Sequence, residues 1–165
     1  MKVESKIYPL NGADENSPCA LTVDFALTYF LVSGELERSN QPVNLIITDA
    51  SGMSVLTAWA AGKFSSSTVK KTFETLDIEN KIKNRTLIIP GKVAVMKGEI
   101  QEKLPGWNVV VGPLEAVQLP KYMKDKEYEA AAKAAAAAKV EEGKQKVRDA
   151  ANKKVNDVLN KALGN

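Results

Sequence analysis

Short apolar runs rich in β-branched residues alternate with segments of helical period between residues 19 and 122. This alternation is typical of a parallel sheet that is covered by helices on both faces. The apolar runs predict four strands, at Cys19–Val23, Val43–Thr48, Thr86–Ile89 and Asn108–Val111. The remaining segments predict helices over residues 25–32, 54–62, 66–76, 93–104 and 114–123. The pattern therefore predicts an α/β fold with a small doubly wound (Rossmann-like), mostly parallel sheet.

The two ends of the chain differ from this central part. Residues 1–18 contain Pro9, Asn11-Gly12 and a turn-rich stretch, which predicts an extended N-terminal arm. Residues 123–165 are rich in alanine and lysine and contain no proline, so they predict a helical tail. We therefore expect three parts: an arm at 1–18, an α/β domain at 19–122 and a helical tail at 123–165.

The tail carries one narrow apolar stripe. Beyond Gly143 the stripe consists of Val147, Ala151, Val155, Val158, Ala162 and Leu163. A helix with so thin a stripe is marginally stable alone. One possibility is that it packs on the α/β domain, on a second copy or on another protein. The alternative is a solvated helix with fraying ends.

The loops that follow the predicted strands are the first place to look for a ligand site. Ligands of open α/β sheets bind outside the carboxyl ends of the strands, which here are followed by residues 24–25, 49–54, 90–91 and 112–113. Three of these four loops contain glycine, which lets a ligand approach the backbone, although glycine also serves simply to form turns. The dinucleotide and triphosphate signatures G-x-G-x-x-G and G-x-x-x-x-G-K-[ST] are both missing.

Composition and charge narrow the possible functions. Hydrophobic residues make up 44% and charged residues 26% of the chain, as in globular proteins, and no apolar run is long enough to cross a membrane. The start of the chain does not resemble a secretory signal, so we expect a cytoplasmic protein without a membrane partner. Residues 1–120 have a net charge of −1 and residues 121–165 of +4, so the α/β domain has no basic face for nucleic acid.

The absence of histidine is the most restrictive fact of composition. With no histidine and a single cysteine, Cys19, the chain cannot form a Ser-His-Asp or Cys-His catalytic site, a histidine-ligated metal site or a four-thiolate iron–sulfur cluster. It also cannot hold a corrinoid through a histidine below the cobalt. We expect no metal ligand among its side chains.

Four motifs resemble a known family. They are residues 24–30 (DFALTYF), 52–64 (GMSVLTAWAAGKF), 87–91 (LIIPG) and 104–113 (LPGWNVVVGP). In sequence and in order they resemble the C-terminal corrinoid-binding domain of the large (gamma) subunit of the corrinoid iron–sulfur protein. That subunit belongs to the acetyl-CoA synthase/decarbonylase system of the anaerobic Wood–Ljungdahl pathway. The resemblance covers roughly residues 17–122.

The resemblance implies a methyl carrier. In this family a cobamide (cobalamin-type corrinoid) is bound base-off, and its cobalt, which is the nucleophile, takes a methyl group from a methyl-tetrahydropterin methyltransferase and passes it to acetyl-CoA synthase. The implied partners are that methyltransferase, acetyl-CoA synthase or a second corrinoid-protein subunit, and a separate reductive activator. The resemblance implies no catalytic side chain, and it implies that the corrinoid lies against Asp24, Phe25, Thr28, Gly52, Met53, Ser54, Thr57, Ala60, Ala61, Gly91, Gly112 and Pro113.

The chain also departs from the family. It lacks the family's N-terminal four-cysteine cluster domain and its central barrel, and it has Asp24 where the family usually has asparagine. Two other functions therefore remain open. One is a non-catalytic assembly or corrinoid-storage subunit, and the other is a flavodoxin-like module for another flat cofactor or a nucleotide.

Overall fold

The computed structural model describes residues 1–164, and it describes the side chains of these residues except those of 128–139. The chain divides into two units, Met1–Asp125 and Lys126–Asn165. The alanine run at 130–138 falls among the residues without described side chains. None of the described helices is long and apolar enough to span a membrane.

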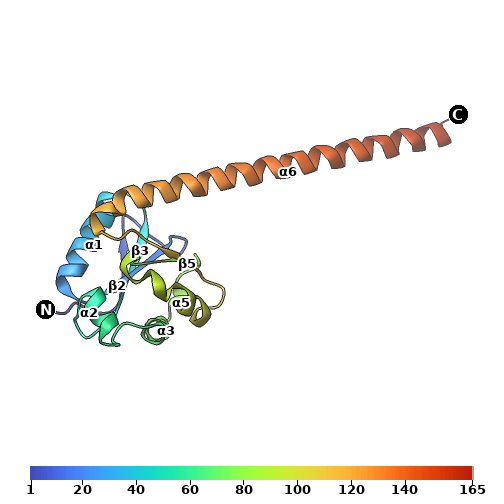
Figure 1. The fold of residues 1–165 in the computed structure, drawn as a ribbon. Coiled ribbons are helices and arrows are strands. Elements are labelled where there is room, and N and C mark those ends of the chain that lie inside the picture. The colour runs from blue at the N-terminus through green and yellow to red at the C-terminus, as the bar shows by residue number, and fades with distance from the viewer. Residues whose placement is uncertain (165) are drawn as a thin grey trace. The chain divides into compact units, whose positions relative to one another are not determined.

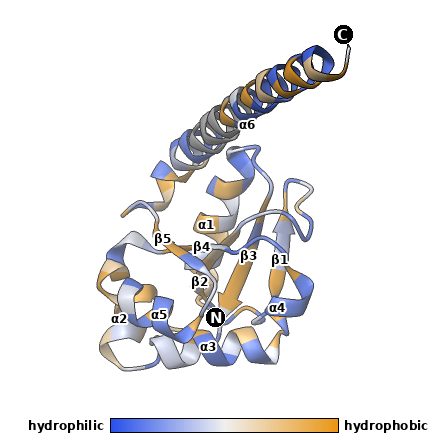
Figure 2. Ribbon diagram, turned by 90° about the vertical axis from the view of Figure 1, so that its right-hand side faces the viewer, coloured by the Kyte–Doolittle hydropathy of each residue, from blue (hydrophilic) through white to orange (hydrophobic). Residues whose placement is uncertain are grey.

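The first unit is built on a five-stranded sheet (Figure 1). The strands have the order β1-β3-β2-β4-β5 (Figure 2). The strands are β1 (Ile7–Leu10), β2 (Cys19–Val23), β3 (Val43–Thr48), β4 (Thr86–Ile89) and β5 (Asn108–Val111). Strands β2 to β5 are parallel, and β1 pairs antiparallel with the edge of β3. The predicted α/β fold is thus confirmed, with the four predicted strands at their predicted bounds.

The structure adds β1, which lies within the residues predicted to be an extended arm. The pairing Pro9↔Asn44 lies in the middle of this strand pair. Proline cannot donate a ladder hydrogen bond, and it is tolerated here because β1 is an edge strand. The arm is therefore extended but is also part of the sheet.

Helices cover both faces of the sheet. The helices of the first unit are α1 (Ala26–Arg38), α2 (Val55–Ala60), α3 (Ser66–Thr75), α4 (Ile78–Lys81) and α5 (Lys97–Lys103), with 3-10 turns η1 (Gly91–Met96) and η2 (Ala116–Gln118). The 93–104 segment, predicted as one helix, is divided into η1 and α5, and the chain is also kinked inside η1, where Val93 has non-helical angles (φ −115°, ψ 33°). Likewise, the 114–123 segment contains η2 and the start of α6 (Leu119–Leu163).

Two hydrophobic cores follow from this arrangement. On one face Leu21, Ile46 and Ile89 pack with residues of α2, α3, α4 and α5. On the other face Ala20, Leu45 and Ile88 pack with Leu36 of α1 and with Leu119 and Met123 from the start of α6. The strands are apolar on both faces, as Figure 2 shows for β3, because both faces are covered.

Candidate functional site

The order of the strands creates a crevice between β2 and β4. The chain leaves β2 through α1 to reach β3 on one side, and it leaves β4 through η1 and α5 to reach β5 on the other side. The connections thus diverge from two adjacent strands. Such a switch point is where open α/β sheets bind their ligands.

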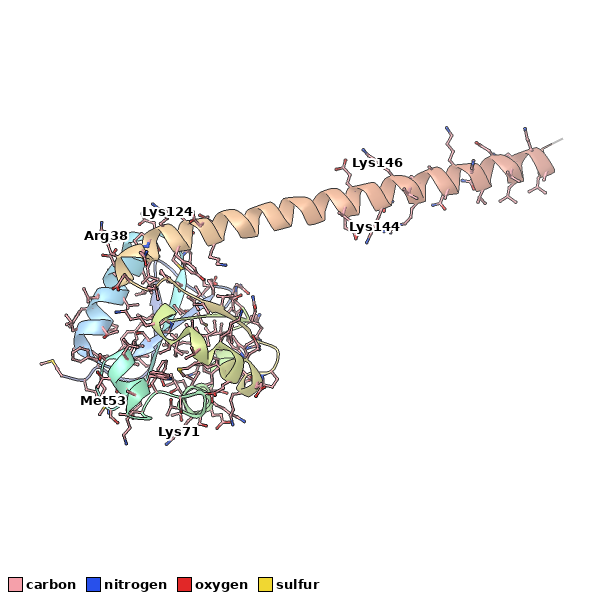
Figure 3. All side chains as sticks on the ribbon, in the orientation of Figure 1. Arg38, Met53, Lys71, Lys124, Lys144 and Lys146 are labelled. Atoms are coloured by element: carbon pink, nitrogen blue, oxygen red, sulfur yellow. The ribbon has the colours of Figure 1, made fainter. Side chains whose placement is uncertain are left out.

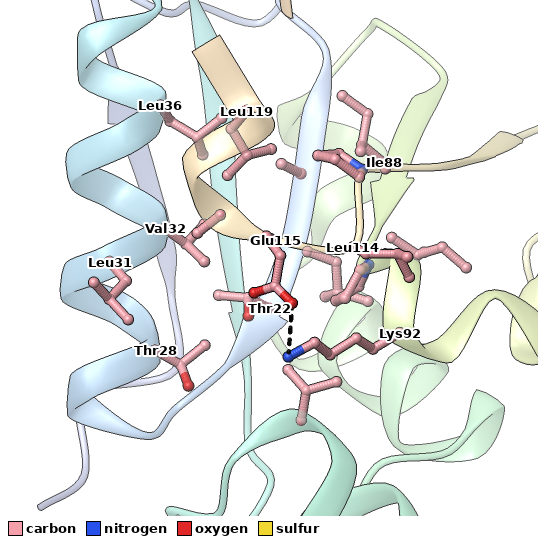
Figure 4. Close-up of a pocket in the computed structure, with 18 of the residues that line it drawn as sticks. Thr22, Thr28, Leu31, Val32, Leu36, Ile88, Lys92, Leu114, Glu115 and Leu119 are labelled. Carbon is pink, nitrogen blue, oxygen red and sulfur yellow. Dashed lines mark ion pairs between the residues drawn. The ribbon is translucent and has the colours of Figure 1, made fainter. Parts of the chain in front are cut away.

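A cavity of about 270 Å³ lies at this switch point (Figure 4). Thr22 of β2 and Ile88 of β4 form part of its floor, and Thr28, Leu31 and Val32 of α1 form one wall. The first residues of α2 and the segment after β5 complete it, contributing Ser54, Val55, Leu56, Gly112, Pro113, Leu114, Glu115 and Ala116. The cavity is therefore mostly apolar, with a few hydroxyl groups and one ion pair.

That ion pair joins Lys92 and Glu115 across the cavity. Lys92 Nζ lies 3.6 Å from Glu115 Oε1, and both side chains are substantially exposed (Figure 4). An exposed pair of this kind contributes little to stability, roughly 0–1 kcal/mol. Because separating the two side chains costs little free energy, each of them can instead bind a polar group of a ligand.

Apolar side chains at the same cavity are also exposed to solvent. Leu31 is 54% exposed, Leu56 47% and Leu114 64%. Further large apolar side chains are exposed on α1 (Leu27 and Phe30), α2 (Trp59), η1 (Val95) and η2 (Val117). Single exposed apolar residues are ordinary, but several around one cavity indicate a surface that binds a ligand or a partner.

Asp24 fixes the loop that leads into α2. Its carboxylate is fully buried, and Oδ1 accepts hydrogen bonds from the backbone N–H groups of Ala50 (3.1 Å) and Gly52 (2.9 Å). Oδ2 has no hydrogen-bond partner, although Lys2 Nζ lies 3.8 Å away. Asp24 therefore positions one loop of the site rather than lining the cavity.

Lys2 connects Asp24 with a second carboxylate, that of Asp49. Lys2 Nζ lies 3.4 Å from Asp49 Oδ1. The pKa of the Asp49 carboxyl is lowered, chiefly by the hydrogen bond from the Ser51 N–H and further by the charge of Lys2. Gly52 in the same loop has φ +71°, a conformation that residues with a side chain rarely adopt. The first residues of the chain thus hold the β3–α2 loop.

The α2 helix presents small side chains to solvent. Thr57, Ala60 and Ala61 are exposed, whereas Ala58 is buried in the core. Ser54 stands at the N-cap position, but its hydroxyl donates to Thr57 Oγ1 (3.0 Å) and makes no capping hydrogen bond. Ser54 therefore does not cap α2, and it is one of the residues that line the cavity.

Gly91 shows why one of the loop glycines is needed. A Cβ at this position would lie 2.6 Å from the carbonyl oxygens of both Gly112 and Pro113. The space beside Gly91 is thus filled by the backbone of the neighbouring loop. Because Gly91 has no side chain, the loops after β4 and β5 can lie in contact. This contact places Gly112 and Pro113 at the cavity.

The structure divides the twelve expected site residues into three groups. Thr28, Ser54, Gly112 and Pro113 line the cavity. Thr57, Ala60 and Ala61 lie on the exposed surface of α2. The others belong to the supporting loops and to the core: Asp24, Phe25, Gly52, Met53 and Gly91.

Sequence reasoning missed the apolar lining and the ion pair of the cavity. Leu31, Leu56 and Leu114 resemble core residues in the sequence, and only the fold shows that they are exposed. Lys92 and Glu115 stand just after the two predicted loops 90–91 and 112–113, so widening those loops by two residues would have included them.

Comparisons with known proteins identify the family of the chain. Residues 1–123 match the model of the family described as CO dehydrogenase/acetyl-CoA synthase delta subunit. The chain is 44% identical over 116 residues to the corrinoid/iron-sulfur protein large subunit of Moorella thermoacetica, covering 70% of this chain and 26% of that protein. It is 38% identical over 122 residues to the acetyl-CoA decarbonylase/synthase complex subunit gamma of Methanopyrus kandleri, covering 74% and 26%. The chain thus spans about a quarter of the length of these relatives.

Proposed function

Because the chain belongs to the CO dehydrogenase/acetyl-CoA synthase delta subunit family, we propose that its first unit is a corrinoid-binding module that carries a methyl group within such a complex. The observation that carries this proposal is the apolar cavity at the β2/β4 switch point, bordered by exposed apolar side chains. A flat, largely apolar macrocycle with polar substituents suits a surface of this composition.

The residues present fit a cobamide. The cavity of about 270 Å³ is near the lower end of the usual range for ligand pockets, so it suits a projecting part of the cofactor rather than the whole. The exposed Leu31, Leu56 and Leu114 would hold the remainder, and the small exposed side chains of Ala60 and Ala61 would leave room for it at the end of α2. When bound, the cobalt would supply the nucleophile that accepts and passes on the methyl group.

The side chains of this module would bind and position the cofactor. Asp24 holds the β3–α2 loop through its two backbone hydrogen bonds. Thr22, Thr28 and Ser54 offer hydroxyl groups to polar substituents at the cavity. The chain has no histidine, so none of its side chains could supply an imidazole to the metal. A methyltransferase, acetyl-CoA synthase or another subunit would cover the exposed apolar side chains.

Two other functions have support of their own. The parallel strands have the order β3-β2-β4-β5, which is also that of flavodoxin-like sheets with a flavin at the same switch point. A module that only stores a corrinoid or assembles a complex would use the same cavity without methyl transfer. These functions differ in which ligand binds and in what the bound ligand does.

Titration of the purified chain with a cobamide tests the proposal. We expect uptake of one equivalent with the absorption spectrum of the base-off form, and no comparable uptake of flavin mononucleotide. Leu31→Glu, which places a charge on the cavity wall, should weaken uptake at least tenfold, whereas Ser67→Glu on the exposed surface of α3 should not change it.

Each outcome has a defined consequence. Flavin uptake without cobamide uptake would favour the flavodoxin-like alternative, and equal cobamide affinity of Leu31→Glu and Ser67→Glu would place the site elsewhere. Transfer of a methyl group from a methyl-tetrahydropterin methyltransferase to the loaded protein would distinguish a carrier from a storage subunit.

A further inference from the structure

The charged side chains at the cavity are those of Lys92 and Glu115. Among the residues that the structure places around the cavity no others are charged, and the hydroxyl groups come from Thr22, Thr28 and Ser54. Figure 4 shows the two charged side chains extending toward one another, Lys92 from η1 and Glu115 from the residue before η2. A ligand that enters this apolar cavity therefore meets one cation and one anion.

The backbone that carries Lys92 is held on both sides. Lys92 stands between Gly91 and Val93, which are both buried. The Gly91 N–H donates to the Pro113 carbonyl (3.2 Å), and the Val93 N–H donates to the Pro90 carbonyl (3.1 Å). The Lys92 side chain itself is 43% exposed. Its ammonium group is thus presented to the cavity from a fixed position of the chain, which is what a binding residue requires.

The two members of the ion pair differ in their other contacts. The Glu115 carboxylate also accepts a hydrogen bond from the backbone N–H of Gln118, within the capping box of η2. Lys92, among the side chains that the structure describes, has Glu115 as its ion-pair partner, at 3.6 Å. Separation of the pair would thus leave Glu115 hydrogen-bonded to η2, whereas Lys92 would need a new anion. Lys92 is therefore the member of the pair that is available to a ligand.

We propose that Lys92 binds the phosphodiester group of a cobamide, an inference that rests on the corrinoid site proposed above. This anionic group lies in the chain that links the ring of a cobamide to its lower base. The amide groups around the ring are neutral and cannot balance an ammonium group. A charge that a ligand covers without supplying a counter-charge is costly. Lys92 therefore makes the cavity selective for the complete cofactor over the same ring without its nucleotide chain.

Other basic side chains of the first unit lie outside the lining of the cavity. Arg38, the last residue of α1, is paired with Glu35 at 3.2 Å. Lys71 lies on the exposed surface of α3, where Figure 3 shows it at the outside of the unit. A lysine such as Lys71 contributes to the overall charge without contacting the cavity, so it provides a matched control for Lys92.

Equilibrium dialysis of the full chain with two corrinoids tests this role of Lys92. One is a cobamide, and the other is cobinamide, which has the same ring but lacks the phosphodiester and the lower base. Lys92→Met should weaken cobamide binding about tenfold and leave cobinamide binding unchanged. Lys92→Arg keeps the charge and should keep the cobamide affinity of the native chain. Lys71→Met removes the same charge from α3 and should change neither affinity.

Glu115→Gln provides a second measurement. Glutamine keeps an acceptor oxygen for the Gln118 N–H, but it removes the charge that competes for Lys92. Cobamide binding should therefore become tighter, by up to about fivefold, with no change for cobinamide. Weaker cobamide binding by this variant would contradict the proposal.

The two corrinoids also distinguish this inference from the proposed function. Equal losses of cobamide and cobinamide affinity in Lys92→Met, or no loss of either, would overturn the role of Lys92 and leave the corrinoid site in place. Uptake of neither corrinoid by the native chain would overturn the corrinoid site, and the role of Lys92 with it. Unchanged cobinamide binding by Lys92→Met shows that the variant is folded, so a selective loss of cobamide affinity reports on the phosphodiester contact.

Discussion

Gly91→Ala tests whether the β4 and β5 loops meet as closely as the structure shows. Gly91 is the first residue of η1, separated from β4 by Pro90, and it is buried. An added Cβ would lie 2.6 Å from two carbonyl oxygens and 2.7 Å from the carbonyl carbon of Pro113. Since ordinary contact begins at 3.4 Å, the two loops would have to separate by about 0.8 Å.

The loops cannot avoid this clash by rotating a side chain. The Gly91 N–H donates to the Pro113 carbonyl (3.2 Å), and the Gly112 N–H donates to the Ile89 carbonyl (2.8 Å), so separation strains or breaks these hydrogen bonds. Overpacking of this kind costs about 1–3 kcal/mol. We expect the free energy of unfolding to fall by about 2 kcal/mol.

Gly98→Ala is the matched control. Gly98 lies exposed in α5, and a Cβ there would have no neighbour within 4 Å. Alanine is favoured over glycine inside a helix, so this variant should be more stable by about 0.5–1 kcal/mol. Urea unfolding measures both variants through the fluorescence of Trp107, which is 3% exposed in the folded protein. Equal stability of the two variants would refute the close approach of the loops.

Three further predictions concern Asp24, Asp49 and Cys19. Asp24→Ala leaves the N–H groups of Ala50 and Gly52 without their acceptor and should lower the free energy of unfolding by about 2–4 kcal/mol. Asp24→Asn keeps an acceptor oxygen and should lower it less. Equal losses of free energy in urea unfolding of the two variants would contradict this prediction. The pKa of the Asp49 carboxyl is lower in the folded state than in the unfolded state, so at a pH between these two pKa values the folded state binds fewer protons. The Asp49 carboxylate therefore contributes stability fully above its ordinary pKa, and this contribution is lost as the pH falls through the lowered pKa of the folded state. In an NMR titration, Lys2→Met should raise the pKa of Asp49. Cys19, with a pKa of about 12 owing to burial, should react with a thiol reagent at mildly alkaline pH only after unfolding, and rapid reaction of the folded chain would contradict its burial.

The parallel strands were predictable because each one is short and apolar throughout. Val43–Thr48, for example, is buried at every position, and turn residues precede and follow it. The edge strand β1 gave no such pattern, since Ile7 and Tyr8 are only partly buried and Pro9 is exposed. Edge strands have one unpaired side, so fewer of their residues need to be apolar. Their sequences therefore resemble loops.

The helices were predicted less well because their ends depend on packing. Helix α1 continues past residue 32 to Arg38, through Gly34, since Leu36 is fully buried against the sheet. Burial of Leu36 outweighs the low helix propensity of glycine, which costs about 1 kcal/mol. The bounds 19–122 of the α/β domain were inferred from the alternation of apolar runs and helical segments, and they stay a prediction, like the bounds of the arm and the tail.

The apolar wall of the cavity could not have been found from periodicity. Helix α1 carries leucine and phenylalanine at 27, 30 and 31 in addition to the buried Leu36, so its sequence resembles that of a helix with a broad buried side. Only the strand order shows that α1 stands at the switch point, where Leu31 is left 54% exposed by the elements that the structure describes. A helix that needed only to cover the sheet would gain solubility from polar residues at these positions. Their apolar character is therefore better explained by a ligand or partner that covers them, which is the condition that the proposed corrinoid site fulfils.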